Sequence, residues 1–285
     1  MVIPIRDENP TRRFPVVTAA LIAVNCFVYF FVQMPKSDVQ DLEFLYEYAA
    51  VPCEVTSGEP VVAVPVSPFG QPLAGTPTGC AVGATGIETP QPVYPDKNVY
   101  LAVLFSMFLH GSILHVLGNM LFLWIFGNNV EDRLGPIGFL LFYVVTGLAA
   151  AGAHIALNAD DPTPVVGASG AIAGVMGAYI VWFPHARVLS ILPIFFFFTF
   201  VELPAVVVLG LWFVLQFFTS PDTGVAWLAH VGGFVAGAAL AYALGGALGP
   251  PRIGPSRPPP TWGRRAGRRD DPGDWGFRGP PRGGG

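Results

Sequence analysis

A serine and a histidine stand in two stretches of the sequence that carry no charged residue. Ser169 lies in GASGA, between small residues, and His230 lies in AHVGG. A serine hydroxyl attacks a carbonyl carbon once a histidine accepts its proton, so these residue types could perform acyl transfer. The alternative for Ser169 is to cap a helix N-terminus, which is a common role of serine.

A second polar pair lies in SMFLHGSILHVLGNM, residues 106–120. His115 and Asn119 are four residues apart and therefore share one helix face. Both side chains donate hydrogen bonds, so with the backbone N–H of Ser169 they could stabilise the oxyanion formed during acyl transfer. The alternative is a polar contact between two helices, which the spacing explains equally well. His110 lies one turn higher, where a structural role and a role facing water are both open.

Small residues accompany Ser169 and His230 at helical spacing. Intervals of three and four place each set along one helix face and let two backbones approach closely. Such an approach would bring Ser169 and His230 within hydrogen-bond distance, although packing alone also explains the glycines. The small residues are Gly167, Gly170, Gly174 and Gly177 in one stretch, and Ala229, Gly233 and Gly237 in the other.

These residues belong to a sequence that predicts a membrane protein. Only 12% of the 285 residues are charged, against about 25% in soluble domains. Six uncharged runs are long enough to cross a hydrocarbon core, which takes about 20 residues. They are 14–35, 98–130, 134–159, 162–186, 203–221 and 223–251. A seventh run, 188–201, carries FFFF at 195–198 and favours an interfacial or re-entrant segment.

The charged residues predict the orientation of the chain. With six spans and a cytoplasmic N-terminus, 13 of the 15 lysines and arginines fall on the cytoplasmic side. This positive-inside bias predicts that both termini lie in the cytoplasm. We expect an integral protein of the plasma (inner) membrane. The first run is too long for a signal peptide, and no small-x-small cleavage site follows Met34, so we expect a retained span. No aspartate or glutamate lies in the six runs, so a Ser–His dyad is expected, with the other nitrogen of His230 held by a neutral group.

The segments outside the spans are a loop and a tail. We divide the chain into a cytoplasmic N-terminus, a membrane domain with a long external first loop, and a cytoplasmic tail: 1–13, 14–248 (loop 35–98) and 249–285. Ten prolines in the loop favour a small capping element or partial disorder. The tail holds 9 Pro, 10 Gly and 8 Arg, a composition typical of disorder. Cys53 and Cys80 lie in the external loop, where they could form a disulfide or remain free thiols.

Four motifs resemble those of the rhomboid family of intramembrane serine proteases, in its bacterial six-span type. They are HGSILHVLGNM at 110–120, NNVEDRLG at 128–135, GASG at 167–170 and AHVGGFVAG at 229–237. The resemblance implies an all-α bundle of six transmembrane helices. It also implies Ser169 as the nucleophile, His230 as its base, and an oxyanion hole formed by His115, Asn119 and the Ser169 amide.

The chain departs from the family pattern in two places. Some members carry a tyrosine four residues after the serine, stacked on the catalytic histidine, whereas this chain has Ala173. Many carry a Trp-Arg pair in a helical hairpin of the first external loop, whereas 35–98 is a proline-rich loop without that pair. The resemblance also implies that Glu131 and Arg133 are structural. It implies a mobile lateral gate at the fifth span, although the aromatic residues at 212–213 are equally well explained as membrane anchors.

The resemblance and the residues together predict cleavage of membrane proteins inside or just outside the membrane. We expect single-pass or multi-pass membrane proteins as substrates, unwound at the outer leaflet, with the lipid bilayer as a partner and no nucleic acid. An alternative is a catalytically inactive rhomboid-like binder, although such relatives usually lose the serine or the histidine. A small transporter would show repeats between its halves, and none is found.

The sequence contains no motif for a cofactor. No nucleotide-binding loop, CxxC pair or HExxH helix occurs in it. We therefore expect neither a cofactor nor a metal. The two remaining histidines, His154 and His185, are isolated near loop ends, and we expect both to be inert.

Overall fold

The computed structural model describes residues 2–61, 93–194, 197–219 and 225–249. The expected disorder of the tail falls outside these residues, as do Cys80 and the remainder of the proline-rich loop. The chain divides into two units, 1–255 and 256–285. All described residues belong to the first unit.

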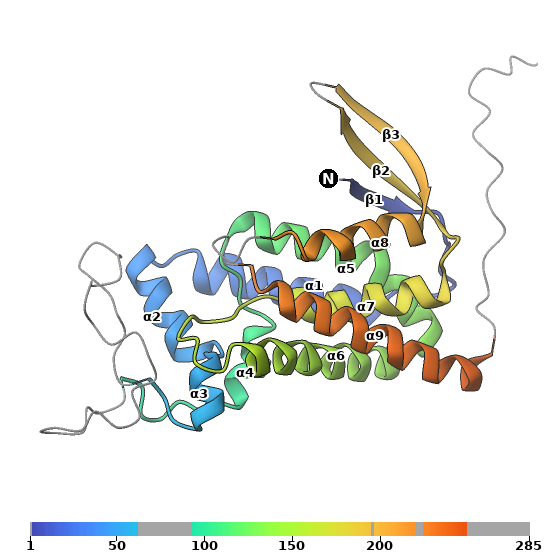
Figure 1. The fold of residues 1–285 in the computed structure, drawn as a ribbon. Coiled ribbons are helices and arrows are strands. Elements are labelled where there is room, and N and C mark those ends of the chain that lie inside the picture. Colours follow the sequence, from blue (N-terminus) through green and yellow to red (C-terminus); the bar gives the residue numbers. More distant parts are fainter. Residues whose placement is uncertain (1, 62–92, 195–196, 220–224, 250–285) are drawn as a thin grey trace, which may run out of the picture. The chain divides into compact units, whose positions relative to one another are not determined.

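An α-helical bundle occupies the six uncharged runs of the sequence (Figure 1). Its first helix, α1, continues directly as a π-helix, η1, and the others follow in chain order. The bounds are α1 (Val16–Phe27), η1 (Val28–Gln33), α5 (Ile113–Leu134), α6 (Pro136–Leu157), α7 (Ser169–Trp182), α8 (Ala205–Gln216) and α9 (Trp227–Leu248).

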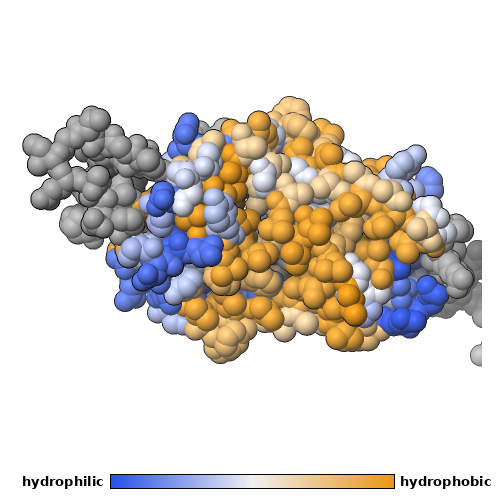
Figure 2. All heavy atoms as spheres, turned by 90° about the horizontal axis from the view of Figure 1, so that it is seen from below, coloured by the Kyte–Doolittle hydropathy of each residue, from blue (hydrophilic) through white to orange (hydrophobic). Residues whose placement is uncertain are grey.

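Four helices of the described part are long and apolar enough to cross a membrane: α1 with η1, α5, α6 and α9. The helices α7 and α8 have 14 and 12 residues, fewer than the about 20 that a full crossing takes. In Figure 2 hydrophobic residues cover the middle of the visible face and hydrophilic residues gather toward its ends. The expected membrane bundle is confirmed, and the chain is an integral membrane protein. That six helices cross the membrane stays a prediction.

The first helix receives its N-terminal cap from another helix. Pro15 precedes α1 and supplies no side-chain cap. The buried carboxylate of Glu131, near the end of α5, instead accepts hydrogen bonds from Val17 N at 2.9 Å and from Thr18 N and Oγ1 at 2.7 and 2.8 Å. A carboxylate at this position satisfies free N–H groups and interacts favourably with the helix dipole. Glu131 is therefore structural, as the resemblance implied.

The helices α7 and α9 are in direct backbone contact along a line of glycines. A Cβ atom at Gly233 would collide with the carbonyl oxygen of Gly170, and a Cβ atom at Gly237 would collide with that of Gly174. Any side chain at these positions would therefore push the two helices apart. The close approach that the spacing predicted is present, and it fixes the first turns of both helices relative to each other.

A three-stranded antiparallel sheet lies at the end of the bundle where α7 ends (Figure 1). Its order is β1 (Ile3–Asp7), β2 (Arg187–Ile194) and β3 (Phe197–Pro204). Val188 and Ser190 are buried, whereas Leu189 between them is only partly so, which is the two-residue alternation of a strand. The described residues of 188–201, for which the sequence suggested an interfacial or re-entrant piece, thus belong to the antiparallel strands β2 and β3, which the hydropathy pattern did not reveal.

Asp7, the last residue of β1, joins the sheet to the bundle. Its Oδ2 accepts a hydrogen bond from the Tyr179 hydroxyl at 2.7 Å and another from Asn129 Nδ2 at 2.6 Å. Burial raises the pKa of Asp7 from its ordinary value of 3.8 to about 6, although both hydrogen bonds lower it. The strand is thereby connected to both α5 and α7.

Short helices lie between η1 and α5. They are α2 (Asp38–Tyr48), α3 (Pro52–Ser57) and α4 (Leu101–Ser106). The proline content of the loop 35–98 did not predict the first two, and the third lies in the uncharged run 98–130, which was expected to be one span but is interrupted before α5. Helix α2 begins with a capping box in which Ser37 and Gln40 each accept a hydrogen bond from the other's backbone N–H. The spacing Ser37-x-x-Gln40 is a helix-start signal that could have identified it.

A buried ion pair organises the described part of this loop. Lys97 Nζ lies 2.5 Å from Glu54 Oε2, and the two side chains are 1% and 0% exposed. Lys97 also donates to the carbonyl oxygen of Tyr46 at 2.7 Å. Burial lowers the pKa of Lys97, and the contact with Glu54 opposes that shift. Next to Glu54, Cys53 is disulfide-bonded; because Cys80 lies outside the described residues, the pairing of these two cysteines stays a prediction.

Candidate active site

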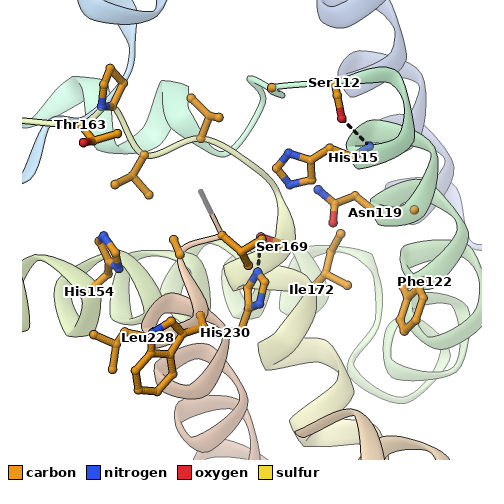
Figure 3. Close-up of a pocket in the computed structure, with 18 of the residues that line it drawn as sticks. Ser112, His115, Asn119, Phe122, His154, Thr163, Ser169, Ile172, Leu228 and His230 are labelled. Carbon is orange, nitrogen blue, oxygen red and sulfur yellow. Dashed lines mark hydrogen bonds between the residues drawn. The ribbon is translucent and has the colours of Figure 1, made fainter. Parts of the chain in front are cut away.

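Ser169 and His230 are in hydrogen-bond contact. Ser169 is the first residue of α7, and His230 lies in the first turn of α9. Nε2 of His230 lies 2.8 Å from Oγ of Ser169, and Figure 3 shows the two side chains facing each other. Ala168 occupies the N-cap position of α7, so the capping role considered for Ser169 is wrong. The hydroxyl is directed at an imidazole, as nucleophilic catalysis requires.

Gly167 forms the turn that presents Ser169. Its φ is +127°, a conformation that favours glycine, and its N–H donates to the carbonyl oxygen of Ser106 at 2.9 Å. A Cβ atom at this position would lie 2.9 Å from the His115 ring and 3.3 Å from Ser169 Oγ. Glycine therefore lets the imidazole of His115 come close to the nucleophile.

The polar pair on α5 lines the same cavity as Ser169 (Figure 3). Ser112 caps α5 by accepting a hydrogen bond from His115 N at 3.2 Å. Asn119 is 8% exposed, and its Nδ2 has no hydrogen-bond partner in the described part of the chain. A buried donor left unpaired beside a nucleophile is available to a developing oxyanion. The alternative, a polar contact that joins two helices, is not made by this amide nitrogen.

The cavity around these side chains has a volume of about 770 Å³, within the range of ligand-binding pockets. Apolar side chains from α5, α7 and α8 line it, and so do polar residues that follow α6. The apolar group includes Phe122, Ile172, Met176 and Trp212, and the polar group includes Asn158, Asp161 and Thr163. Ser169 therefore lies in a cavity that has both apolar and polar walls.

The second nitrogen of His230 is held by α8. Gln216 Oε1 lies 2.8 Å from His230 Nδ1. The Trp212 ring packs against the imidazole with a centroid distance of 5.7 Å and an interplanar angle of 38°. The neutral partner expected for this nitrogen is thus a glutamine amide, and Trp212 contributes the ring contact that Ala173 cannot. A single glutamine at a helix end belongs to no motif, so the sequence did not reveal Gln216.

The structure corrects the expectation that His110 could face water. His110 is 1% exposed, and its backbone N–H and C=O are bonded to the side chain of Gln33, both at 3.0 Å. Its ring packs edge-on against His115, with a centroid distance of 5.1 Å. The buried ring of His110 therefore packs against the His115 ring and stabilises its position.

The two histidines expected to be inert have different surroundings. His185 is exposed and does not line the cavity, whereas His154 lines it together with Asn158. The sequence signal for this was the spacing of four residues, about one helical turn. Asn158 directly follows α6, and its Nδ2 donates to the carbonyl oxygen of His154 at 2.8 Å. That His154 is inert stays a prediction.

Residues 97–247 match the Rhomboid domain family. Rhomboid protein 1, mitochondrial, of Saccharomyces cerevisiae is 35% identical over 95 residues, covering 31% of this chain and 27% of that protein. Rhomboid protease GluP of Bacillus subtilis is 30% identical over 169 residues, covering 57% and 31%. RHOMBOID-like protein 5 of Arabidopsis thaliana is 28% identical over 147 residues, covering 50% and 43%. The chain thus spans less than half the length of these relatives.

Proposed function

The chain belongs to the rhomboid family, and we propose that it is an intramembrane serine endopeptidase with Ser169 and His230 as its catalytic dyad. The observation that carries the proposal is the 2.8 Å contact between Ser169 Oγ and His230 Nε2, in a bundle with an apolar surface. The unpaired amide nitrogen of Asn119 in the same cavity supports it. The relative from Bacillus subtilis is named a rhomboid protease.

The first half of the reaction forms an acyl-enzyme. Ser169 Oγ attacks the scissile carbonyl carbon while its proton passes to His230 Nε2. The carbonyl oxygen becomes an oxyanion and accepts hydrogen bonds from Asn119 Nδ2, the His115 ring and the Ser169 N–H. The tetrahedral intermediate then collapses, the C–N bond breaks, and His230 gives the proton to the leaving amine. The product is an ester between Ser169 and the N-terminal part of the substrate.

The second half releases this ester with water. His230 Nε2, again unprotonated, takes a proton from a water molecule that attacks the ester carbonyl carbon. The same three donors stabilise the second oxyanion. Breakage of the C–O bond returns the proton to Ser169 Oγ and liberates a carboxylic acid. The polar wall at His154, Asn158 and Asp161 would admit water to this otherwise apolar bundle.

The substrates we propose are single-pass or multi-pass membrane proteins. Ser169 and His230 lie at the ends of α7 and α9 that face the α2–α3 loop, away from the β-sheet (Figure 1). With both termini in the cytoplasm, as the basic residues predict, this end faces the outer leaflet of the plasma membrane. A transmembrane helix that unwinds there would expose its backbone to the dyad.

The test is cleavage by the purified full-length protein in detergent micelles. Wild type, Ser169→Ala, His230→Ala and the control variant His185→Ala are incubated with a panel of tagged model transmembrane substrates and, separately, with a fluorophosphonate probe for activated serines. Thermal unfolding establishes that each variant is folded. His185 is the matched control because it is a histidine outside the cavity.

We expect cleavage and probe labelling by wild type and by His185→Ala. Both signals should fall by at least about 10⁴-fold in the two dyad variants, since a dyad acts as a unit. Cleavage that persists in Ser169→Ala would disprove the mechanism. If wild type neither cleaves nor reacts with the probe, the catalytically inactive binder is the better description.

A further inference from the structure

Two residues of α8 contact the His230 imidazole, one at Nδ1 and one against the ring. Gln216 Oε1 lies 2.8 Å from His230 Nδ1, and the Trp212 side chain packs against the imidazole ring. Gln216 is 7% exposed and ends a helix, AVVVLGLWFVLQ, whose other side chains are all apolar. Burying an amide costs free energy unless its hydrogen bonds are made. The packing of α8 alone therefore does not explain why a glutamine is buried at this position.

The orientation of the Gln216 amide is set by its second hydrogen bond. Nε2 donates to the carbonyl oxygen of Trp212 at 2.9 Å, one turn earlier in α8. A carbonyl can only accept, so the amide nitrogen must face it and Oε1 must face His230. Rotating the amide by half a turn would bring two oxygen acceptors together and turn an N–H₂ donor toward the imidazole.

This orientation selects the tautomer of the imidazole. Because Oε1 can only accept, Nδ1 of His230 must carry the hydrogen. Nε2 then keeps its lone pair and faces the Ser169 hydroxyl at 2.8 Å. That is the protonation state in which a histidine can take a proton from serine. A carboxylate commonly serves this purpose in serine hydrolases, and here a neutral amide occupies the position.

We propose that Gln216 is the positioning residue of His230, and that α8 controls the base by supplying it. This rests on the proposed function. His230 is held in the state of a general base only while α8 packs against α9. If α8 moves away from α9, His230 loses its acceptor at Nδ1 and its aromatic support at once. The nucleophile on α7 and the donors on α5 would keep their places, since neither belongs to α8.

The first test reads the tautomer and does not depend on catalysis. The full-length protein is prepared in micelles with ¹⁵N-labelled histidine, and the His230 signals are assigned by their loss in His230→Ala. In wild type we expect a protonated Nδ1 and an unprotonated Nε2. In Gln216→Leu this preference should be lost, whereas the control variant Thr219→Val should keep it. Thr219 lies just beyond α8, and its hydroxyl donates to the carbonyl oxygen of Leu215 at 3.3 Å.

The second test reads catalysis. We expect kcat to fall by about 100-fold in Gln216→Leu with KM nearly unchanged, the size of effect that a misplaced catalytic group produces. Gln216→Glu keeps an acceptor for Nδ1 but loses the donor to the Trp212 carbonyl oxygen, so it should recover only part of kcat. Its carboxylate should also stabilise the imidazolium, so the acidic limb of the kcat profile moves to higher pH. A loss of packing alone would not give this shift.

The outcomes separate this inference from the proposed function. A wild-type protein that fails to cleave but shows the expected tautomer, lost in Gln216→Leu, supports the role of Gln216 and counts against protease activity. Cleavage with an unaltered tautomer and kcat in Gln216→Leu overturns the role of Gln216 and leaves the dyad standing. A proton on Nε2 in wild type also overturns it. If Gln216→Leu does not fold, Gln216→Glu decides, because an unshifted pH profile contradicts the proposal.

Discussion

The charge on Asp7 should destabilise the folded protein above about pH 6. Its pKa is raised by burial from 3.8 to about 6, so between these values the native state holds a proton that the unfolded state has released. The stabilisation is complete below about pH 4 and is lost as the pH rises through 6. The pKa of Asp7 differs by about 2 between the folded and unfolded states, and each pKa unit corresponds to about 1.4 kcal/mol. The free energy of unfolding is therefore about 3 kcal/mol lower above pH 6 than below pH 4.

The substitution Asp7→Asn removes this dependence. The amide oxygen of asparagine can still accept hydrogen bonds from Tyr179 and Asn129, which both bond to Asp7 Oδ2. We therefore expect similar stability of wild type and variant near pH 4, and a variant more stable by up to about 3 kcal/mol at pH 8. For a domain of this size that is a difference in Tm of roughly 6–12 °C.

Thermal unfolding of both proteins in the same micelle, from pH 4 to pH 8, measures the effect. Asp160→Asn is the matched control, since Asp160 is an exposed acidic residue outside the sheet and should leave the pH dependence of Tm unchanged. Tm curves of wild type and Asp7→Asn that run parallel over the whole range would refute the argument. So would a variant that is less stable than wild type at pH 8.

Three further substitutions have expected outcomes. Gly237→Ala should push α9 from α7, lowering Tm and reducing fluorophosphonate labelling by about 100-fold, whereas Gly246→Ala on the same helix meets no atom within 4 Å and should retain both. Asn119→Ala should lower kcat by about 10²–10³-fold with little change in KM if its amide binds the oxyanion; steady-state kinetics decide, and an unchanged kcat removes Asn119 from the oxyanion hole. Lys97→Met leaves the buried carboxylate of Glu54 without its cation, so the loop that precedes α4 should be cut faster by an added protease, and an unaltered rate would contradict this.

The dyad and its neighbours could be predicted because each had a local signature. Ser169 and His230 stood in uncharged stretches, and His115 and Asn119 had the four-residue spacing of a helix face. The spacing of small residues also predicted that α7 and α9 approach closely. These are properties of short segments. A membrane span makes its backbone hydrogen bonds within its own helix, so helical spacing in the sequence predicts which side chains share a face.

What the sequence did not reveal depends on contacts between distant segments. Gln216 acquires its role only when α8 packs beside His230, and nothing in its own neighbourhood marks it. The β-sheet joins residues 3–7 to 187–204. The partner of the first strand is therefore about 180 residues away in the sequence, and no local pattern can identify it. Helix α2 is different, because its capping box at Ser37 is a local signal that the sequence itself contains.

The cap that Glu131 provides to α1 has a consequence for synthesis. During translation α1 leaves the ribosome more than a hundred residues before Glu131, which bonds Thr18 across a separation of 113 positions. Until α5 arrives, the first N–H groups of α1 must be satisfied by water or lipid headgroups at the membrane surface. The first helix can therefore insert early but can complete its N-terminus only after the second long helix has docked. A chain with Glu131→Ala should insert α1 normally and fail at this later step, leaving a helix that lies in the bilayer without its place in the bundle.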